Sequence, residues 1–446
     1  MGVAAIAVLS GWILVELRNA AVGPVPFNVL WAAAVGAFFG GFAVATPRYT
    51  LPPRGLGSAL LGVVVVVAGS VAATRLVWDG SERLAAGVAV LMAGAFVAGV
   101  LARNVWPKVA TATLVLVVEV FSLWALLDGL RLIDGAWLYD FRTYLASGAE
   151  FAAGENPYLS APLTVLEADP AAAGFLSSPI LLPVFAVLAA LPYPVAATAW
   201  VAMLVACAVA GLRLLGLPWR WAVLLVASPM LFPESGNLAN VIFLLLCLGP
   251  AVGGALVQGA IFKLQAGIPA AWLVRERRWR DLGIGLLALI GLALITLPLV
   301  GLGSWSDYVV GLEMRARSQE NLPILYGLSL AQWLPWAAFI GLSAAAVIAG
   351  ALLAGRRGLS GLGLATIVAS PSLWAHGFAA AIPAMLFLDA PLFWLALGIG
   401  STGYWLWVLL IAGVWGIWRA RQALTHDDPL HPLAGRTGPW EAWEPR

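Results

Sequence analysis

Apolar runs long enough to cross a lipid bilayer recur along this sequence, and they constrain its fold more than any other feature. The clearest runs lie at 3–17, 28–46, 57–74, 85–102, 109–127, 194–212 and 282–302. A helix of roughly 20 apolar residues crosses the hydrocarbon core. Only 10% of the residues are charged, against about 25% in soluble globular proteins. The sequence therefore predicts an all-α polytopic membrane protein.

Charge and cysteine usage narrow the possible partners. The net charge of +2 gives no indication of a nucleic-acid partner. Cys207 and Cys247 both lie in apolar runs, which favours packed thiols over a disulfide or a metal pair. The N-terminus has no basic region ahead of its apolar run, so we interpret it as a retained helix rather than a signal peptide. No metal-binding spacing, nucleotide loop or carboxylate cage is found, so no cofactor or metal is expected.

Proline placement predicts broken helices. Many of the 28 prolines lie inside or beside apolar runs. The stretch "SPILLPVFAVLAALPYP" is too short and too rich in proline for an easy full span, which favours a half-inserted helix. The path of 219–274 stays open. Broken backbone at membrane depth is tolerated where it is buried or lines a wet cavity. We therefore expect a bundle of about 12–14 transmembrane or half-inserted helices around a cavity.

The densest basic run gives the bundle an orientation. "RERRWRD" carries Arg275, Arg277, Arg278 and Arg280 and should be cytoplasmic. The span 282–302 would then exit, leaving 303–323 as an external loop. The loop 129–178, with a short interfacial helix over 137–153, and the region of His376 would lie on the same face. These three polar segments predict one extracytoplasmic site in a multi-pass plasma-membrane protein.

Three parts of the chain are predicted. Residues 1–108 form an N-terminal four-helix membrane segment with no assigned role. Residues 109–418 form the functional membrane domain. Residues 419–446 are polar and contain proline, which predicts a disordered cytoplasmic tail.

Asp140 is the first candidate for chemistry. It lies in "YDFRTYLASGAEFAAGENPY", between two aromatic residues. A carboxylate partly shielded from water can act as a general base. The alternative is an ordinary aspartate that caps the following helix, because "DFRTY" is also typical of a helix start.

Other polar residues interrupt apolar surroundings. Lys263 and Arg142 are cations near the membrane that suit a phosphate, although snorkelling to the interface is the alternative for Lys263. His376 follows "SPSLW" and could share a proton, contact a phosphate or be structural. Glu119, in the middle of a span, would suit a proton relay. Asn237 and Asn240 lie in the break "PESGNLAN", where loop and cap roles compete with a binding role.

These segments together resemble a known family, the GT-C glycosyltransferases that use polyprenyl-phosphate-mannose, including phosphatidylinositol mannoside mannosyltransferases. The stretch 139–158 matches the family's Asp, Tyr, small-residue run and Gly-x-x-Pro-Tyr at Asp140, Tyr144, Ser147–Gly148, Gly154 and Pro157–Tyr158. "PESGNLANVIFLLL", "AIFKLQAGIPAAWLVRERRWR", "ENLPILYGLSL" and "SPSLWAHGFAAAIP" follow in the family's order. Two elements depart from its pattern: Gly-Gln-x-Asn reads Gly236-Asn237-Leu238-Ala239-Asn240, and Asn-Gln-Ser reads Asn321-Leu322-Pro323. The resemblance covers about 109–400.

The resemblance implies a membrane-embedded glycosyltransferase. It would move a sugar, mannose in the family, from a polyprenyl-phosphate donor to a hydroxyl of a lipid or glycan acceptor, with inversion. It implies that Asp140 is the base and that His376 assists. Substrate contacts would come from Arg142, Tyr144, Tyr158, Asn237, Asn240, Lys263, Gln265 and Asn321.

Two other functions compete with this interpretation. Broken helices around a cavity also serve lipid or solute transporters, but the sequence shows no paired halves, and Glu119 alone lies in the middle of a span. A polymerase or ligase of lipid-linked glycans would carry a much larger external loop with several Arg and His.

Overall fold

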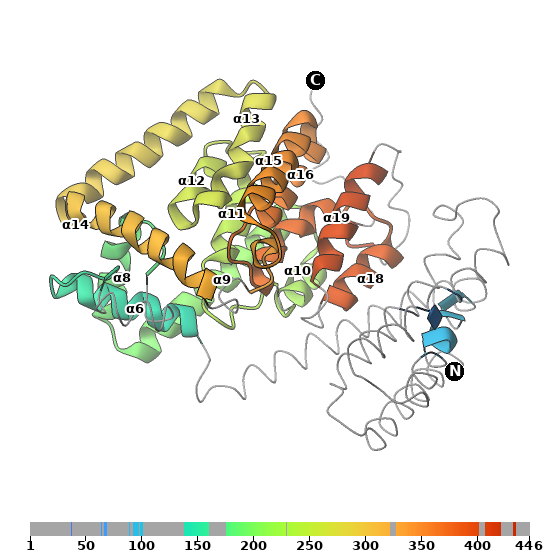
Figure 1. The fold of residues 1–446 in the computed structure, drawn as a ribbon, viewed down its shortest axis with the longest axis horizontal. Helices are drawn as coiled ribbons and strands as arrows, with labels where there is room; N and C mark the ends of the chain where they lie inside the picture. The colour runs from blue at the N-terminus through green and yellow to red at the C-terminus, as the bar shows by residue number, and fades with distance from the viewer. Residues whose placement is uncertain are drawn as a thin grey trace, which may run out of the picture. The chain divides into compact units, whose positions relative to one another are not determined.

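The computed structural model describes residues 138–159, 175–228, 230–321, 327–400, 406–420 and 431–433, with isolated positions up to residue 100. These residues form helices and no strand, apart from one isolated bridge between Gly327 and Leu373. The predicted all-α class is therefore confirmed for the described part of the chain (Figure 1). The elements are α6 (Tyr139–Ala152), η3 (Pro179–Leu181), α8 (Leu182–Ala189), α9 (Tyr193–Leu214), α10 (Trp219–Val226), α11 (Ala239–Leu248), α12 (Ala255–Phe262), η4 (Leu264–Ala270), α13 (Ala271–Arg275), α14 (Trp279–Asn321), η6 (Leu330–Gln332), α15 (Trp336–Leu352), α16 (Gly355–Val368), η7 (Ala375–Ala381), α17 (Ile382–Met385), α18 (Ala390–Gly400) and α19 (Trp407–Arg419).

The chain divides into two compact units. The first comprises Met1–Phe121, Leu388–Ala412 and His426–Ala434, and the second comprises Ser122–Phe387, Gly413–Thr425 and Gly435–Arg446. In the first unit, residues 431–433, which belong to the segment predicted as a disordered tail, are packed against the protein. His431 is buried, its Nε2 donates to the carbonyl oxygen of Leu388 at 2.9 Å, and its Nδ1 accepts from the amide of Leu433 at 3.0 Å. Most of the predicted N-terminal segment 1–108, and Glu119, lie outside the described residues.

Two of the described helices are long and apolar enough to cross a membrane, which indicates membrane association. They are α9 and the stretch Trp279–Ala316 of α14. The helix predicted at 194–212 is confirmed by α9. Large apolar side chains of α14 are exposed, among them Leu287, Leu294, Ile295 and Leu302. Four shorter apolar helices, Pro179–Ala189, Ala239–Leu248, Trp336–Leu352 and Trp407–Arg419, accompany these two.

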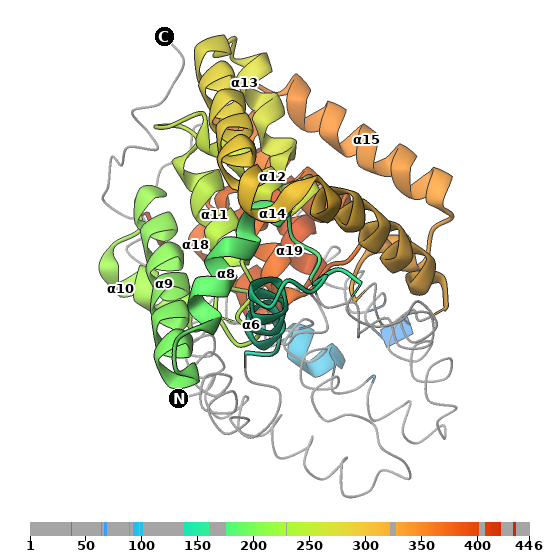
Figure 2. The same ribbon diagram turned by 90° about the vertical axis from the view of Figure 1, so that its left-hand side faces the viewer.

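Helix α14 differs from the prediction in its second half. The span predicted at 282–302 is helical, but the loop predicted from 303 onward is wrong, because the helix continues to Asn321. The backbone turns at Gly301, which has φ 72° and ψ 162°, three residues after Pro298. Figures 1 and 2 both show the resulting bend. Beyond it, Trp305, Tyr308 and Leu312 recur at helical spacing and pack on an aromatic core.

That aromatic core joins α6 to its neighbours. Phe141 of α6 stacks on Trp200 of α9 with ring centroids 5.0 Å apart. Tyr144 lies 4.9 Å from Phe185 of α8 by the same measure. Gly148 lets α6 approach α8 closely, since a Cβ there would lie 2.4 Å from the Phe185 carbonyl carbon. Helix α6 confirms the helix predicted over 137–153. It packs along α8 and contacts α9 through the stack of Phe141 on Trp200.

Two irregular segments prepare the site. Segment η4 packs between α12 and α16, and η7 packs against α11 and α16. Gly259 of α12 permits the approach of η4, because a Cβ there would lie 2.2 Å from the carbonyl oxygen of Ala266. Lys263 links α12 to η4 in an extended conformation, and His376 lies in the first turn of η7.

Candidate functional site

Asp140 lies in the first turn of α6, and its side chain is free for a role other than capping. The N-cap position is Leu138, with φ 57°, so the predicted alternative of Asp140 as helix cap does not describe this helix. The start of α6 rests on the loop at 234–237 instead. The amide of Leu138 donates to the carbonyl oxygen of Glu234, and that of Asp140 to the carbonyl oxygen of Ser235, both at 2.8 Å. Gly236 (φ 72°) brings this loop onto Phe141.

Asn237 holds the Asp140 carboxylate. Its Nδ2 donates to Asp140 Oδ2 at 3.0 Å and reaches the Tyr144 hydroxyl at 3.4 Å. Its Oδ1 accepts from the amide of Ala239, where α11 begins. Burial, with a smaller contribution from the charge of Asp140, raises the pKa of Tyr144 well above its ordinary value. Tyr144 is therefore a neutral phenol.

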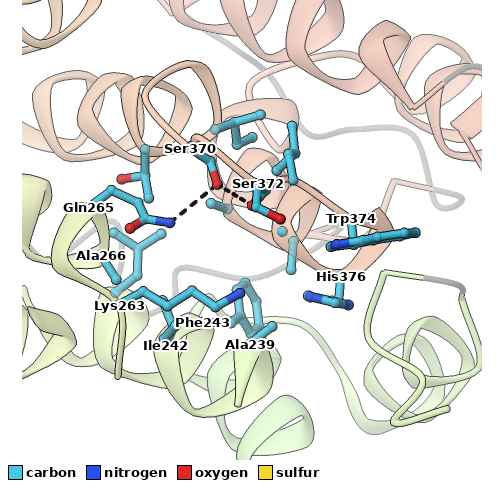
Figure 3. A pocket seen from close by; sticks show the side chains of 17 residues that line it. Ala239, Ile242, Phe243, Lys263, Gln265, Ala266, Ser370, Ser372, Trp374 and His376 are labelled. Atoms are coloured by element: carbon cyan, nitrogen blue, oxygen red, sulfur yellow. Dashed lines mark hydrogen bonds between the residues drawn. The ribbon is translucent and has the colours of Figure 1, made fainter. Parts of the chain in front are cut away.

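A cavity of about 50 Å³ lies beside this cluster. Its polar lining comes from the start of η4, from α16 and the residues after it, and from the start of η7: Lys263, Gln265, Thr366, Ser370, Ser372, Trp374 and His376. Figure 3 shows Lys263 extended along the cavity toward Ala239, with Trp374 and His376 at the other side. Gln265 Nε2 donates to Ser370 Oγ at 3.2 Å, and Ser370 Oγ donates to the carbonyl oxygen of Ser372 at 2.7 Å.

Two nitrogen groups at the cavity have no partner. In the described part of the chain, neither Lys263 Nζ nor His376 Nε2 makes a hydrogen bond, and His376 Nε2 is shielded from solvent. Shielded polar atoms without a partner are rare in folded proteins, and they often mark a place for a ligand or a catalytic role.

Electrostatics couple the cavity to Asp140. Burial lowers the pKa of Lys263, and the nearby charge of Asp140 opposes this shift. Burial, and then the charge of Lys263, lower the pKa of His376 to about 3. His376 is therefore neutral near pH 7. Perturbed groups of this kind at a cavity are typical of functional sites.

The structure brings together some of the predicted residues and separates others. Lys263, Gln265 and His376 line the cavity, and Asp140, Tyr144 and Asn237 form the adjoining cluster. Ala239, which follows this cluster at the start of α11, also lines the cavity.

The remaining predicted residues have other surroundings. Arg142 is exposed and donates from Nε to the Tyr193 hydroxyl at 3.2 Å. Tyr158 is buried in the aromatic core and donates to the carbonyl oxygen of Ser177. Asn240 is buried and donates to the carbonyl oxygens of Leu204 and Leu231. Asn321 is the last residue of α14, and its side chain lies outside the described part.

Ser370, Ser372 and Trp374 line the cavity although sequence reasoning gave them no role. The signal was present in "SPSLWAH", where small polar residues and a tryptophan interrupt two apolar stretches just before His376. Asn156, inside the Gly-x-x-Pro-Tyr match, was also missed. Its Nδ2 donates to Asp307 Oδ2 of α14 at 2.7 Å.

Within the described residues, no three His, Cys, Asp or Glu side chains gather in a way that could hold a metal ion. The chain matches no protein-family model, no curated protein and no solved structure.

Proposed function

We propose that this protein is a polytopic membrane glycosyltransferase that uses a polyprenyl-phosphate sugar as donor and a hydroxyl of a lipid or glycan as acceptor. One observation carries the proposal: the Lys263 amine and His376 Nε2 face a cavity without a protein partner, while Asp140 beside them is held by Asn237. A phosphate would give the two nitrogen groups a hydrogen-bond acceptor, and an acceptor hydroxyl would give its proton to the carboxylate.

The chemistry balances with these groups. Cleavage of the bond between the anomeric carbon and the phosphate oxygen leaves the electron pair on the phosphate, and Lys263 stabilises that charge. The acceptor oxygen forms the new bond to the anomeric carbon from the opposite face and gives its proton to Asp140. The anomeric carbon carries oxocarbenium character in between, as in glycoside hydrolysis. The product is an inverted glycoside, with polyprenyl phosphate as the leaving group.

His376 fits the role of a neutral hydrogen-bond donor to the phosphate. A histidine with a pKa of about 3 cannot supply a proton as imidazolium near pH 7. Its Nε2 can carry a hydrogen and direct it at a phosphate oxygen.

The lipid part of the donor suits the exterior of this chain. Exposed apolar side chains cover the part of α14 before its bend. A long isoprenoid is too apolar to leave the bilayer, so an enzyme for it must place its site within reach of lipid. The resemblance to GT-C mannosyltransferases supports mannose as the sugar and the extracytoplasmic side of the plasma membrane as the site's location.

The test is transfer of radiolabelled mannose from polyprenyl-phosphate-mannose to membrane lipids by the purified protein in liposomes. Asp140→Asn keeps the shape of the side chain and its contact with Asn237, and it removes the base. We expect transfer by the wild type and a loss of at least about a hundred-fold in Asp140→Asn. Glu155→Gln, the same isosteric change at an exposed carboxylate shortly after α6, is the matched control and should retain transfer.

Two outcomes would contradict the proposal. Undiminished transfer by a folded Asp140→Asn variant would exclude Asp140 as the base. Absence of transfer by the wild type with mannose and with other polyprenyl-phosphate sugars would exclude the reaction class.

A further inference from the structure

Trp374 stands out among the residues that line the cavity. Its side chain is 46% exposed although it lines the cavity together with Lys263 and His376. In the part of the chain that the structure describes, no hydrogen bond occupies its indole N–H. Tryptophan combines a large apolar face with one polar donor, which suits a partner that has both kinds of surface.

One face of this indole is already covered. A Cβ built on Gly327 would lie 3.2 Å from both Cδ2 and Cε2 of Trp374, the two atoms of the ring-fusion bond. That bond lies inside the outline of the indole, so an atom close to both of its ends lies over the face of the ring. The Gly327 backbone therefore supports one face. Because the side chain is 46% exposed and lines the cavity, the opposite face is the one that a ligand can reach.

The supporting contact is rigid and requires glycine. Gly327 has φ 58°, and a Cβ there would lie 2.4 Å from the carbonyl oxygen of Leu373. Two hydrogen bonds join the segments 327–329 and 370–374. The amide of Leu328 donates to the Leu373 carbonyl oxygen at 2.7 Å, and Ser329 Oγ donates to the Ser370 carbonyl oxygen at 2.5 Å. The ring is thus held in place before any ligand arrives, which lowers the entropy cost of binding.

The size of the cavity decides which part of a donor reaches this ring. A volume of about 50 Å³ is a few times the roughly 10–15 Å³ that one enclosed water needs. It suits a phosphate beside Lys263 and His376, with the attached sugar left at the mouth. Gln265, whose Oε1 has no bond in the described region, adds an acceptor for a sugar hydroxyl.

We propose that the open face of Trp374 is the stacking platform for the neutral sugar ring of the donor, while the cavity binds its phosphate. A pyranose or furanose ring presents C–H groups on one face and hydroxyls at its edge. The C–H face packs on the apolar, electron-rich face of an aromatic ring. This inference rests on the proposed function and assigns Trp374 to sugar recognition within it.

The test compares two lipids that differ only in the sugar: polyprenyl-phosphate-mannose and polyprenyl phosphate. Binding of each is measured to the full chain in nanodiscs. We expect Trp374→Leu to weaken binding of the mannosyl lipid by roughly three- to ten-fold and to leave polyprenyl phosphate unchanged. Trp374→Tyr should restore most of the loss because it keeps a ring. Lys263→Ala should weaken both lipids.

Two further variants separate sugar stacking from other roles. Trp333→Leu removes an indole that is 65% exposed and does not line the cavity, so it should change neither lipid. Gly327→Ala moves the Trp374 ring without removing it and should reproduce the selective loss. Unchanged binding of polyprenyl phosphate shows in each case that the variant is folded.

The outcomes separate this inference from the proposed function. Wild-type protein that binds neither lipid would overturn the proposed function, and this inference with it. Wild-type protein that binds both lipids, with Trp374→Leu weakening both equally or neither, would overturn the stacking inference alone and assign Trp374 to the membrane interface.

Discussion

A single amide, that of Asn237, connects several parts of the candidate site. It donates to Asp140 and Tyr144 on α6, and it accepts from Ala239 at the start of α11. Because the Asp140 carboxylate binds this amide through Oδ2, its other oxygen is free of this bond and can face an acceptor hydroxyl. Asn237 is therefore a positioning residue for the base.

Substitution of Asn237 by Asp should separate its two roles. The variant keeps the acceptor for Ala239 but loses the donor to Asp140 and places a second carboxylate beside it. A hydrogen bond to a charged group contributes about 1.5–3 kcal/mol, so we expect the transfer rate to fall by roughly ten- to a hundred-fold. Steady-state kinetics check this, and Tyr144→Phe, which removes only the weaker contact at 3.4 Å, should cost less than Asn237→Asp. An unchanged rate would exclude Asn237 from positioning the base.

Lys263 should make the affinity of the site for polyprenyl phosphate depend on pH in the alkaline range. Burial lowers the pKa of this amine below its ordinary value of 10.5, with Asp140 opposing the shift and neutral His376 nearby. The amine is charged below its pKa and loses that charge as the pH rises. We therefore expect affinity for polyprenyl phosphate to fall with rising pH, with a midpoint below 10.5.

The matched variant for this prediction is Lys263→Arg, since a guanidinium stays charged throughout that range. Binding titrations between pH 7 and 10 should show the alkaline loss in the wild type and a much weaker one in the variant. The same alkaline loss in both proteins would assign it to another group.

At the residue scale, the sequence indicates Lys263, which the structure places at the cavity, more clearly than it indicates the role of either asparagine. Lys263 was found because a charge in an apolar stretch is costly without a role. Asn240 belongs to the same polar break as Asn237, but it bonds two backbone carbonyl oxygens. Sequence alone could not separate the two asparagines, because both tasks require the same amide and only the fold decides which partner each one meets.

Helix α6 depends on a close approach at Gly148. Because a Cβ there would lie 2.4 Å from backbone atoms of Phe185, Gly148→Ala should push α6 away from α8 and shift Asp140. Overpacking costs typically about 1–3 kcal/mol. We expect a lower thermal unfolding midpoint in detergent and weaker transfer.

Ala149→Ser, at the neighbouring exposed position on α6, is the control for Gly148 and should behave as the wild type. Equal stability of Gly148→Ala and wild type would mean that α6 and α8 are not in close contact.

The elements themselves were predicted unevenly. Apolar length revealed α9 and the first half of α14, since a long uninterrupted run has one reasonable structure. The sequence predicts a loop for the second half of α14, because the polar segment 303–323 follows the span 282–302. Its helical stripe of Trp305, Tyr308 and Leu312 packs on aromatic residues more than 100 positions away in sequence. The short pieces between 219 and 274 were recognised as breaks, but their path depends on tertiary contacts of η4 with α12 and α16.

For the molecule as a whole, the exposed apolar surface of α14 bears on its environment. Leu294 is 61% exposed in the middle of the stretch before the bend. If lipid covers this surface, Leu294→Arg should impair insertion by about 2.5–3.5 kcal/mol, whereas Leu294→Ile should not. The measurement is the fraction of α14 inserted into microsomal membranes, determined with glycosylation sites engineered on each side. Equal insertion of both variants would place Leu294 away from lipid.

The bend at Gly301 also limits the length of the straight part of α14 that precedes it. A straight helix of 43 residues would extend about 65 Å, more than twice the roughly 30 Å of hydrocarbon in a bilayer. The part before Gly301 measures about 33 Å, close to one bilayer thickness. The part after it is tied through Asp307 to Asn156, in the loop that directly follows α6, the helix that carries Asp140. Under the proposed function, the length of α14 before its bend therefore sets the depth in the membrane at which the sugar is transferred.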